Sequence, residues 1–134
     1  MLNISVFLPN KPGMLAKFLN ILIESDIEIR ALTVAENKEY GLLLFLVDKT
    51  DECIEILEKN NYDVSITEVI AVKMILSNNT KELREIAKIL GENEVNIEYL
   101  YSALIKNESY LILRLDNNKK GKEVLKTKGY DIVN

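Results

Sequence analysis

Residues 25–64 read SDIEIRALTVAENKEYGLLLFLVDKTDECIEILEKNNYDV, and residues 93–132 read NEVNIEYLYSALIKNESYLILRLDNNKKGKEVLKTKGYDI. The second segment begins 68 positions after the first and aligns with it without a gap. The matched pairs include Ile29 with Ile97, Leu32 with Leu100, Leu43 with Leu111, Asp48 with Asp116, Leu57 with Leu125 and Tyr62 with Tyr130. A match of this length indicates an internal duplication. It predicts two domains, residues 1–68 and residues 69–134.

Both halves show the same order of strand-like and helix-like patterns. In the first half we expect strands at 3–8, 28–35, 40–47 and 63–69, and helices at 14–24 and 50–59. In the second half we expect strands at 70–76, 96–104, 109–115 and 130–133, and helices at 80–91 and 118–127. The stripe Leu15, Phe18, Leu19 and Leu22 is expected to face the core from the first helix. The order βαββαβ, repeated, predicts an α+β chain of two tandem ferredoxin-like units, each with an antiparallel sheet and helices on one face.

Composition excludes several classes of function. The 134 residues carry a formal net charge of -4, which argues against nucleic acid as a partner because phosphate binding needs a basic surface. The absence of histidine excludes catalytic triads and zinc sites that need imidazole. A single cysteine, Cys53, fits a reducing compartment, so we expect a cytoplasmic protein. No apolar run is long enough to span a membrane, and no signal peptide is recognisable.

The strand at 40–47, with the sequence YGLLLFLV, is apolar on both faces. A sheet covered by helices on one side only should alternate apolar and polar side chains. The pattern therefore predicts that the second face is covered by the other unit or by another chain, with Leu43 and Phe45 shielded there. We expect a homodimer at least.

The first helix is entered through an unusual sequence, PNKPGMLAKF at residues 9–18. Proline suits the first turn of a helix, so we expect the helix to begin at Pro12 or just before it. Gly13 lets another group approach the backbone closely. The first N–H groups of a helix have no partner inside the helix, and together with the helix dipole they favour a small anion such as a carboxylate.

These residues resemble the ACT domain, a ferredoxin-like module that binds amino acids. The resemblance is carried by Asn10, Pro12, Gly13 and Leu15, by Ile27 and Ile29 on the second strand, and by NEVNIEYLY at 93–101. It covers nearly the whole chain as two tandem copies and is closest to a free-standing pair without a catalytic domain. The resemblance implies a regulatory role with no cofactor. It places the ligand on Asn10, Pro12, Gly13, Met14 and Leu15, with Asn96 contributed across the interface between units.

The second repeat departs from this pattern. Asn10 aligns with Asn78, but Pro12-Gly13 aligns with Thr80-Lys81. Asn79 and Glu82 are spaced as a capping box, which would satisfy that helix start internally. Where repeat 2 has Asn96 on its second strand, repeat 1 has Glu28. One composite site is therefore expected to be intact, and the other, built from Asn78, Lys81 and Glu28, is expected to be defective.

Structural interpretations stand beside these functional ones. The Asn-Lys-Pro-Gly sequence also suits a plain turn, and Asn96 also suits the cap of a strand. Tyr99 and Tyr101 either line a pocket or pack between units, Cys53 is interpreted as a packing residue, and Asp48, Asp51 and Glu52 complement a helix dipole.

Three functions follow. The first is a non-catalytic sensor of a small amino acid, with a metabolic enzyme as its partner. The second is a ligand-free dimerising subunit of a larger enzyme complex. The third is an enzyme, for which the sequence offers no nucleophile–base pair, metal cluster or phosphate loop.

Overall fold

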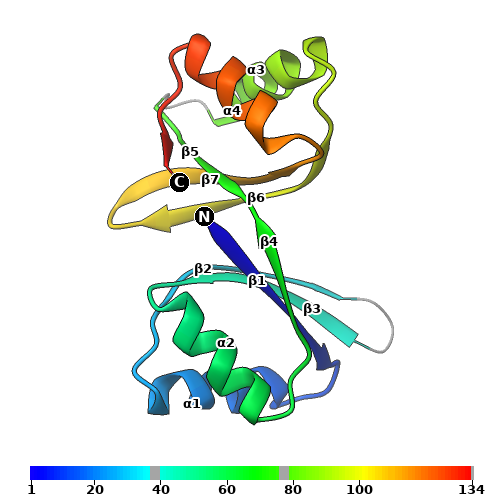
Figure 1. The fold of residues 1–134 in the computed structure, drawn as a ribbon, viewed down its shortest axis with the longest axis vertical. Coiled ribbons are helices and arrows are strands. Elements are labelled where there is room, and N and C mark those ends of the chain that lie inside the picture. The colour runs from blue at the N-terminus through cyan, green and yellow to red at the C-terminus, as the bar shows by residue number, and fades with distance from the viewer. Residues whose placement is uncertain (37–39, 76–78, 134) are drawn as a thin grey trace. The chain divides into compact units, whose positions relative to one another are not determined.

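The protein is described here by a computed structural model that covers residues 1–36, 40–75 and 79–133. Within these ranges the elements follow the order βαββαβ twice (Figure 1). They are β1 (Leu2–Pro9), α1 (Met14–Glu24), β2 (Ile29–Glu36), β3 (Tyr40–Val47), α2 (Thr50–Lys59), β4 (Val64–Glu68), β5 (Ile70–Lys73), α3 (Asn79–Glu92), β6 (Ile97–Ile105), β7 (Glu108–Leu115), α4 (Asn118–Thr127) and β8 (Ile132–Val133). The predicted fold class of two tandem ferredoxin-like units is confirmed.

The chain divides into two compact units, Leu2–Thr67 and Glu68–Asn134 with Met1, which we call the N-terminal and C-terminal units. Residues 37 and 38 of the expected turn lie outside the described residues, and so does Asn78. No helix within the described ranges is both long and apolar enough to cross a membrane.

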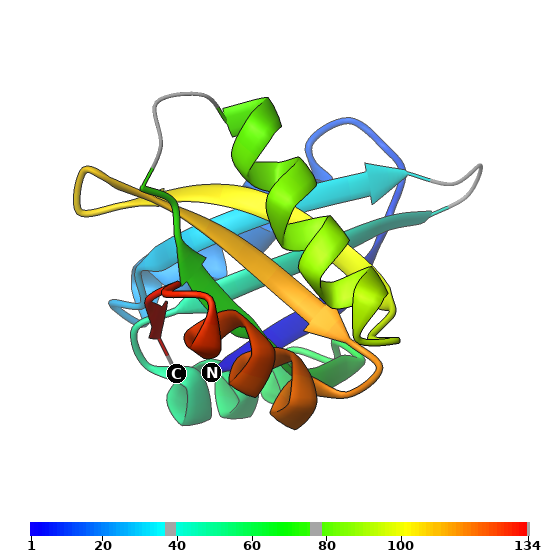
Figure 2. The same cartoon turned by 90° about the horizontal axis from the view of Figure 1, so that it is seen from above.

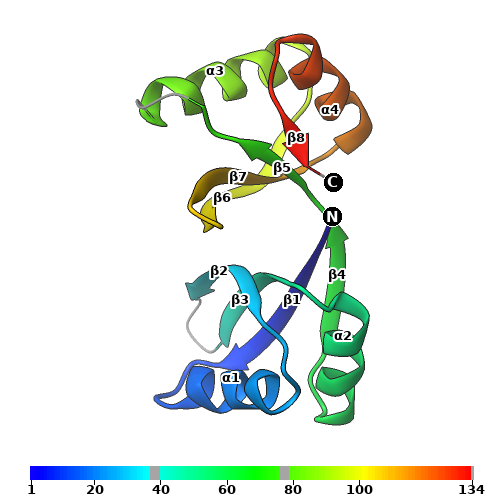
Figure 3. The ribbon, with the colours of Figure 1, turned by 90° about the vertical axis from the view of Figure 1, so that its left-hand side faces the viewer.

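In the N-terminal unit, strands hydrogen-bond in the order β2-β3-β1-β4, and α1 and α2 lie on one face of this sheet (Figure 3). The core between them holds Phe18 and Leu22 of α1 and Cys53 and Leu57 of α2. The phenyl rings of Phe18 and Phe45 meet edge to face, with centroids 5.5 Å apart. Leu15 was expected in the apolar stripe of α1 but is partly exposed, because it lies in the first turn of the helix, outside this core.

Strand β3 corrects one prediction. Leu43 and Phe45 do not lie on the second face of the sheet, because both belong to the core that the unit builds with its own helices. Their neighbours Leu44 and Leu46 alternate with them and occupy the other face, where both are buried. The side chains on both faces of β3 are buried, as the apolar pattern predicts. The prediction was wrong in assigning Leu43 and Phe45, rather than Leu44 and Leu46, to the face without helices.

The C-terminal unit has the strand order β6-β7-β5-β8, and Figure 2 shows α3 and α4 over the strands of this sheet. Its core holds Ile86 and Leu90 of α3, Leu125 of α4, and Leu111 and Leu113 of β7.

The two units differ in the register of their first strands. Ile4 pairs with Phe45 in the N-terminal unit, whereas Ile70 pairs with Leu113 in the C-terminal unit. Phe45 and Leu113 are equivalent positions of the repeat, so Ile70 takes the place of Ile4, although it follows Ile4 by 66 rather than 68 positions. Two more residues therefore separate the first strand from the equivalent helix position in the C-terminal unit, since Glu82 follows Ile70 by 12 positions whereas Met14 follows Ile4 by 10.

Helix α4 approaches its sheet closely at Gly121. A Cβ atom built on Gly121 would overlap Cδ1 of Leu115 and would lie 3.5 Å from Cδ2 of Leu90. The equivalent residue of the N-terminal unit is Cys53, which is buried. Since Leu115 is itself buried, it has little space into which to move.

We predict that Gly121→Ala destabilises the protein. Overpacking a core costs roughly 1–3 kcal/mol, and the better helix propensity of alanine returns roughly 0.5–1 kcal/mol, so a net loss on the order of 1 kcal/mol is expected. Urea unfolding measures this difference.

Gly91→Ala is the matched control, because Gly91 lies in α3 and nothing stands within 4 Å of the place that its Cβ atom would take. It should raise the free energy of unfolding by roughly 0.5–1 kcal/mol. Equal gains from both substitutions would show that α4 does not need the close approach at Gly121.

Candidate functional site

The connection from β1 to α1 places most of the predicted site residues together. Helix α1 begins at Met14, and Gly13 is its N-cap with a φ of 86°. This left-handed conformation keeps Gly13 and Pro12 outside the helix, so the predicted range 14–24 is confirmed and the alternative start at Pro12 is wrong by two residues. The turn is closed by hydrogen bonds from the Lys11 N–H to the Pro9 carbonyl (2.8 Å) and from the Met14 N–H to the Lys11 carbonyl (3.3 Å).

The start of α1 leaves backbone donors open. Lys17 is the first residue of α1 whose N–H reaches a carbonyl four residues earlier, that of Gly13, at 3.1 Å. Among the described residues, the N–H groups of Gly13, Leu15 and Ala16 donate to no backbone carbonyl, and no side chain caps the helix. Two or three convergent N–H groups at a helix N-terminus suit an oxygen anion.

The surroundings of these donors are accessible. Nothing lies within 4 Å of the position that a Cβ atom of Gly13 would occupy. Asn10, Lys11 and Pro12, which precede Gly13 in this connection, are exposed. Ala16 was not among the predicted site residues, and it is implicated because its N–H is one of the open donors in a helix that starts at Met14.

Helix α3 starts in a different way. It has 14 residues against 11 in α1, and the difference is one extra turn, residues 79–81, at its N-terminus. Leu83 and Arg84 occupy the positions of Leu15 and Ala16 in the repeat. In a helix that already begins at Asn79, their N–H groups lie within reach of carbonyls inside the helix. The C-terminal unit therefore does not present the same open donors.

Glu82 has a structural task that the sequence did not reveal. Its side chain is fully buried, and its Oε1 accepts a hydrogen bond of 2.8 Å from the Ile75 N–H. Asn79 lies inside the helix, so the predicted capping box of Asn79 and Glu82 is replaced by this bond to the end of the preceding strand.

The register of the first strands explains why only one unit needs this carboxylate. Ile75 stands where the N-terminal unit has Pro9, and proline has no N–H to satisfy. Met14 takes the position of Glu82 there. The two units therefore build this junction differently. The N-terminal unit has Pro9, which has no N–H, and Met14. The C-terminal unit has the N–H of Ile75, which donates to the buried side chain of Glu82.

Asn96, the sixth predicted site residue, lies in the C-terminal unit directly before β6. Its N–H donates to Oδ1 of Asp116 at 2.9 Å, and its carbonyl accepts from the Asp116 N–H at 3.0 Å. These bonds fix the backbone, while the residue itself is exposed.

The N-terminal unit repeats the same clamp with Glu28 and Asp48, at 3.0 and 3.2 Å. The hydrogen bond from the Glu28 N–H lowers the pKa of the Asp48 carboxyl below its ordinary value. Asp48 therefore ties two strands together in addition to preceding a helix.

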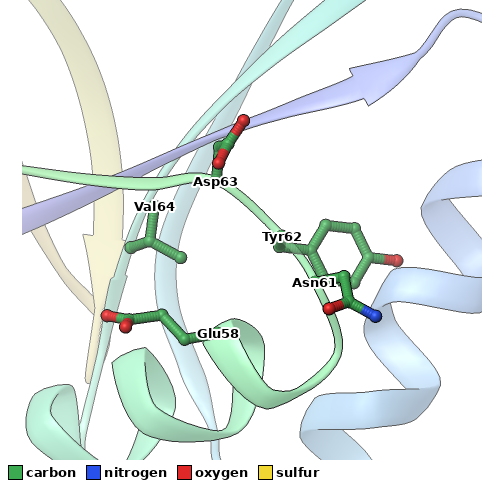
Figure 4. A pocket seen from close by; sticks show the side chains of 5 residues that line it. All are labelled: Glu58, Asn61, Tyr62, Asp63 and Val64. Carbon is green, nitrogen blue, oxygen red and sulfur yellow. The ribbon is translucent and has the colours of Figure 1, made fainter.

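Three other features offer no reactive group. Burial raises the pKa of the Cys53 thiol to about 11, which agrees with its interpretation as a packing residue. Tyr99 and Tyr101 lie on the same strand face with stacked rings 6.4 Å apart. A surface hollow after α2 is lined by Glu58, Asn61, Tyr62, Asp63 and Val64 (Figure 4). Within the described residues, no cluster of acidic or cysteine side chains is arranged to hold a metal ion.

We predict that Glu82→Met lowers the free energy of unfolding, because it leaves the Ile75 N–H without its acceptor. A donor that is left without an acceptor costs about 1–3 kcal/mol, and the loss should be of this size. Thermal and urea unfolding of the full chain measure it.

The double variant Ile75→Pro with Glu82→Met copies Pro9 and Met14 of the N-terminal unit, so it should recover part of the loss by removing the donor. An unchanged stability of Glu82→Met would contradict a structural role for the buried carboxylate.

Comparison with known proteins adds the following. The family described as an ACT domain pair matches residues 1–134. Protein BT0572 from Bacteroides thetaiotaomicron is similar in structure, with a TM-score of 0.85 and 31% identity over 98% of this chain and 90% of that chain.

The ligand-free regulatory subunit of aspartate kinase from Thermus thermophilus has a TM-score of 0.70 at 16% identity, over 96% of this chain and 92% of that chain. The corresponding subunit from Thermus flavus has a TM-score of 0.67 at 14% identity, over 94% and 90%. At these identities the likeness concerns the fold. No curated protein matches the chain in sequence.

Proposed function

Because the chain belongs to the family of ACT domain pairs, we propose that it is a non-catalytic regulatory protein that binds a small amino acid. The observation that carries the proposal is the open start of α1, where Gly13, Leu15 and Ala16 present N–H groups without backbone acceptors among the described residues. Regulatory subunits of aspartate kinase share this fold, which supports a regulatory role.

In the proposed complex, the carboxylate of the ligand accepts hydrogen bonds from the N–H groups at the start of α1. The exposed ammonium group of Lys11 adds a positive charge to the same connection. Asn10 offers both a donor and an acceptor to the rest of the amino acid. Asn96 completes the site from the second strand of a facing ACT unit, with its backbone already fixed by Asp116.

The expected affinity is modest. Each charge-assisted hydrogen bond contributes about 1.5–3 kcal/mol, and the loss of translational and rotational freedom on association removes much of the total. The dissociation constant should therefore fall on the order of micromolar to millimolar. Such an affinity suits a sensor of a metabolite whose concentration varies over a similar range.

The proposed partner is a metabolic enzyme whose activity the bound amino acid adjusts. We place the protein in the cytoplasm, where its buried single cysteine stays reduced.

We predict that Gly13→Glu abolishes amino-acid binding, because it places a negative charge where the ligand carboxylate would lie. Asn96→Ala should weaken binding by removing a side chain that contacts the ligand. Isothermal titration calorimetry with a panel of amino acids measures both effects, and the parent protein should bind one ligand per chain.

Gly129→Glu is the matched control. Gly129 also has a positive φ, 90°, and open space within 4 Å of the point where a Cβ atom would sit, but it follows α4. The control carries the same backbone strain and the same added charge, so it should retain binding. Equal loss of binding in both variants, or no binding by the parent, would refute the proposed site.

A homodimer is also part of the proposal, on a different basis from β3. The strands β2 and β6 lie at the edges of their sheets in the described structure. Both carry exposed apolar side chains, namely Leu32 and Val34 on β2 and Leu100 and Leu104 on β6. An unpaired edge with apolar side chains is suited to pairing with another chain. The same surfaces favour the second candidate function, a dimerising subunit without a ligand.

We predict that light scattering gives twice the mass of one chain. The double variant Val34→Glu with Leu104→Glu places charges on β2 and β6, so it should dissociate the dimer. Glu85→Lys, an exchange of charge on α3 away from the strand edges, should leave the mass unchanged. A monomeric parent protein would exclude the homodimer.

A further inference from the structure

Two exposed aromatic side chains stand next to the connection between β1 and α1. Phe7 is 56% exposed and Tyr40 is 48% exposed. Their rings meet nearly edge to face, with centroids 6.4 Å apart and planes at 78°. Tyr40 pairs with Pro9, the last residue of β1, and Phe7 precedes Pro9 by two residues. The aromatic pair therefore lies at the point where β1 ends and the candidate site begins.

The pair lies on the face of the sheet that does not carry the helices. Val6 and Leu8 flank Phe7 and belong to the core of the N-terminal unit, so Phe7 points to the opposite side. Single exposed apolar residues are common on protein surfaces and need no explanation by themselves. Two adjoining rings at the end of the strand that leads to α1 are a more specific arrangement.

The C-terminal unit provides an internal comparison. Lys73 pairs with Tyr110 as Phe7 pairs with Leu42, and Glu108 occupies the repeat position of Tyr40. In that unit the two positions hold an ion pair, with Lys73 Nζ 3.0 Å from Glu108 Oε1. The hydroxyl group of Tyr110 donates to Oε2 of the same carboxylate at 2.9 Å.

The two differences coincide in the same unit. The N-terminal unit has open donors at the start of α1 and an aromatic pair near the end of β1, the strand that precedes α1. The C-terminal unit has a helix that begins one turn earlier and a pair of opposite charges at the same two positions. The two charges of such an ion pair balance each other and stay hydrated. Exposed aromatic rings, in contrast, are stabilised when another apolar group covers them.

We propose that Phe7 and Tyr40 receive the side chain of the amino acid whose carboxylate binds at the start of α1, and that the ligand is therefore an amino acid with an apolar side chain. This inference rests on the proposed function. It makes Phe7 and Tyr40 specificity-determining residues, and it excludes amino acids with small or charged side chains as preferred ligands.

The rings and the candidate site are close in the chain. Three residues of extended chain separate Phe7 from Asn10, which places their Cα atoms at most about 11 Å apart. The hydrogen bonds from Lys11 to Pro9 and from Met14 to Lys11 close turns directly after β1. The proposal requires the ligand to lie along the end of β1, with its carboxylate toward α1 and its side chain toward the rings.

Calorimetry with the full chain tests the inference. Leucine, methionine and phenylalanine are compared with glycine, aspartate and lysine. In the parent protein, the apolar ligands should bind about tenfold or more tightly than glycine, since even one methylene group in an apolar pocket changes binding about tenfold.

The decisive variant is Phe7→Lys with Tyr40→Glu, which copies the pair of the C-terminal unit. It should bring the affinity for leucine down to that for glycine, and circular dichroism checks that the fold is kept. Lys73→Ala with Glu108→Ala is the matched control and should leave the order of affinities unchanged.

Three outcomes would overturn the inference. One is equal affinity of the parent protein for glycine and leucine, and another is unchanged leucine affinity in the swapped variant. Preferential binding of lysine would point instead to attraction of a cation by the rings. In all three cases, loss of binding in Gly13→Glu would preserve the proposed function, whereas absence of binding to every amino acid would remove both.

Discussion

A helix cannot satisfy its own first N–H groups, and the two units of this chain meet that constraint differently. In the N-terminal unit, Gly13 takes a left-handed conformation and α1 starts late, so several donors stay open. In the C-terminal unit, α3 begins one turn earlier and the carboxylate of Glu82 is buried against the Ile75 N–H. The same βαββαβ architecture thus yields one unit with open N–H groups at Gly13, Leu15 and Ala16, and one unit in which the equivalents of Leu15 and Ala16 lie inside a helix.

The difference extends along the strands that precede the helices. Pro9 has no N–H, which makes a buried acceptor unnecessary at the end of β1 and leaves the junction free for an external group. Phe7 and Tyr40 form an apolar pair where the C-terminal unit has the ion pair of Lys73 and Glu108. The duplicated units therefore carry aromatic rings in one copy and an ion pair in the other at the same two positions.

Much of the fold was predictable because the apolar patterns and the repeat agree with each other. The bounds of α1, β3 and α2 match the predicted ranges, and the remaining strands differ by a few residues at their ends. The faces of β3 were less predictable, because seven consecutive apolar or small residues, 41–47, do not show which set meets the helices. The register of β5 was also hidden, since a shift of two residues keeps every side chain on its own face and leaves the apolar pattern unchanged.

The candidate site was predictable in part. The sequence identified the connection at Asn10, Pro12 and Gly13, because proline and glycine have strong backbone preferences. It predicted two starts for α1, at Met14 and near Pro12, and the choice between them depends on one φ angle, that of Gly13. It also did not show that Glu82 accepts a hydrogen bond from the Ile75 N–H. The offset of 66 between the first strands lies before the part of the repeat that aligns without a gap at an offset of 68, so the alignment did not show it.

The central claim is that the start of α1, and not that of α3, receives the ligand carboxylate. Two-dimensional NMR of the full chain, titrated with leucine, tests it most directly through the backbone amide signals. The amides of Leu15 and Ala16 should show the largest chemical-shift changes, while those of Leu83 and Arg84 stay unchanged. Equal changes at both helix starts, or changes confined to Leu83 and Arg84, would contradict the account.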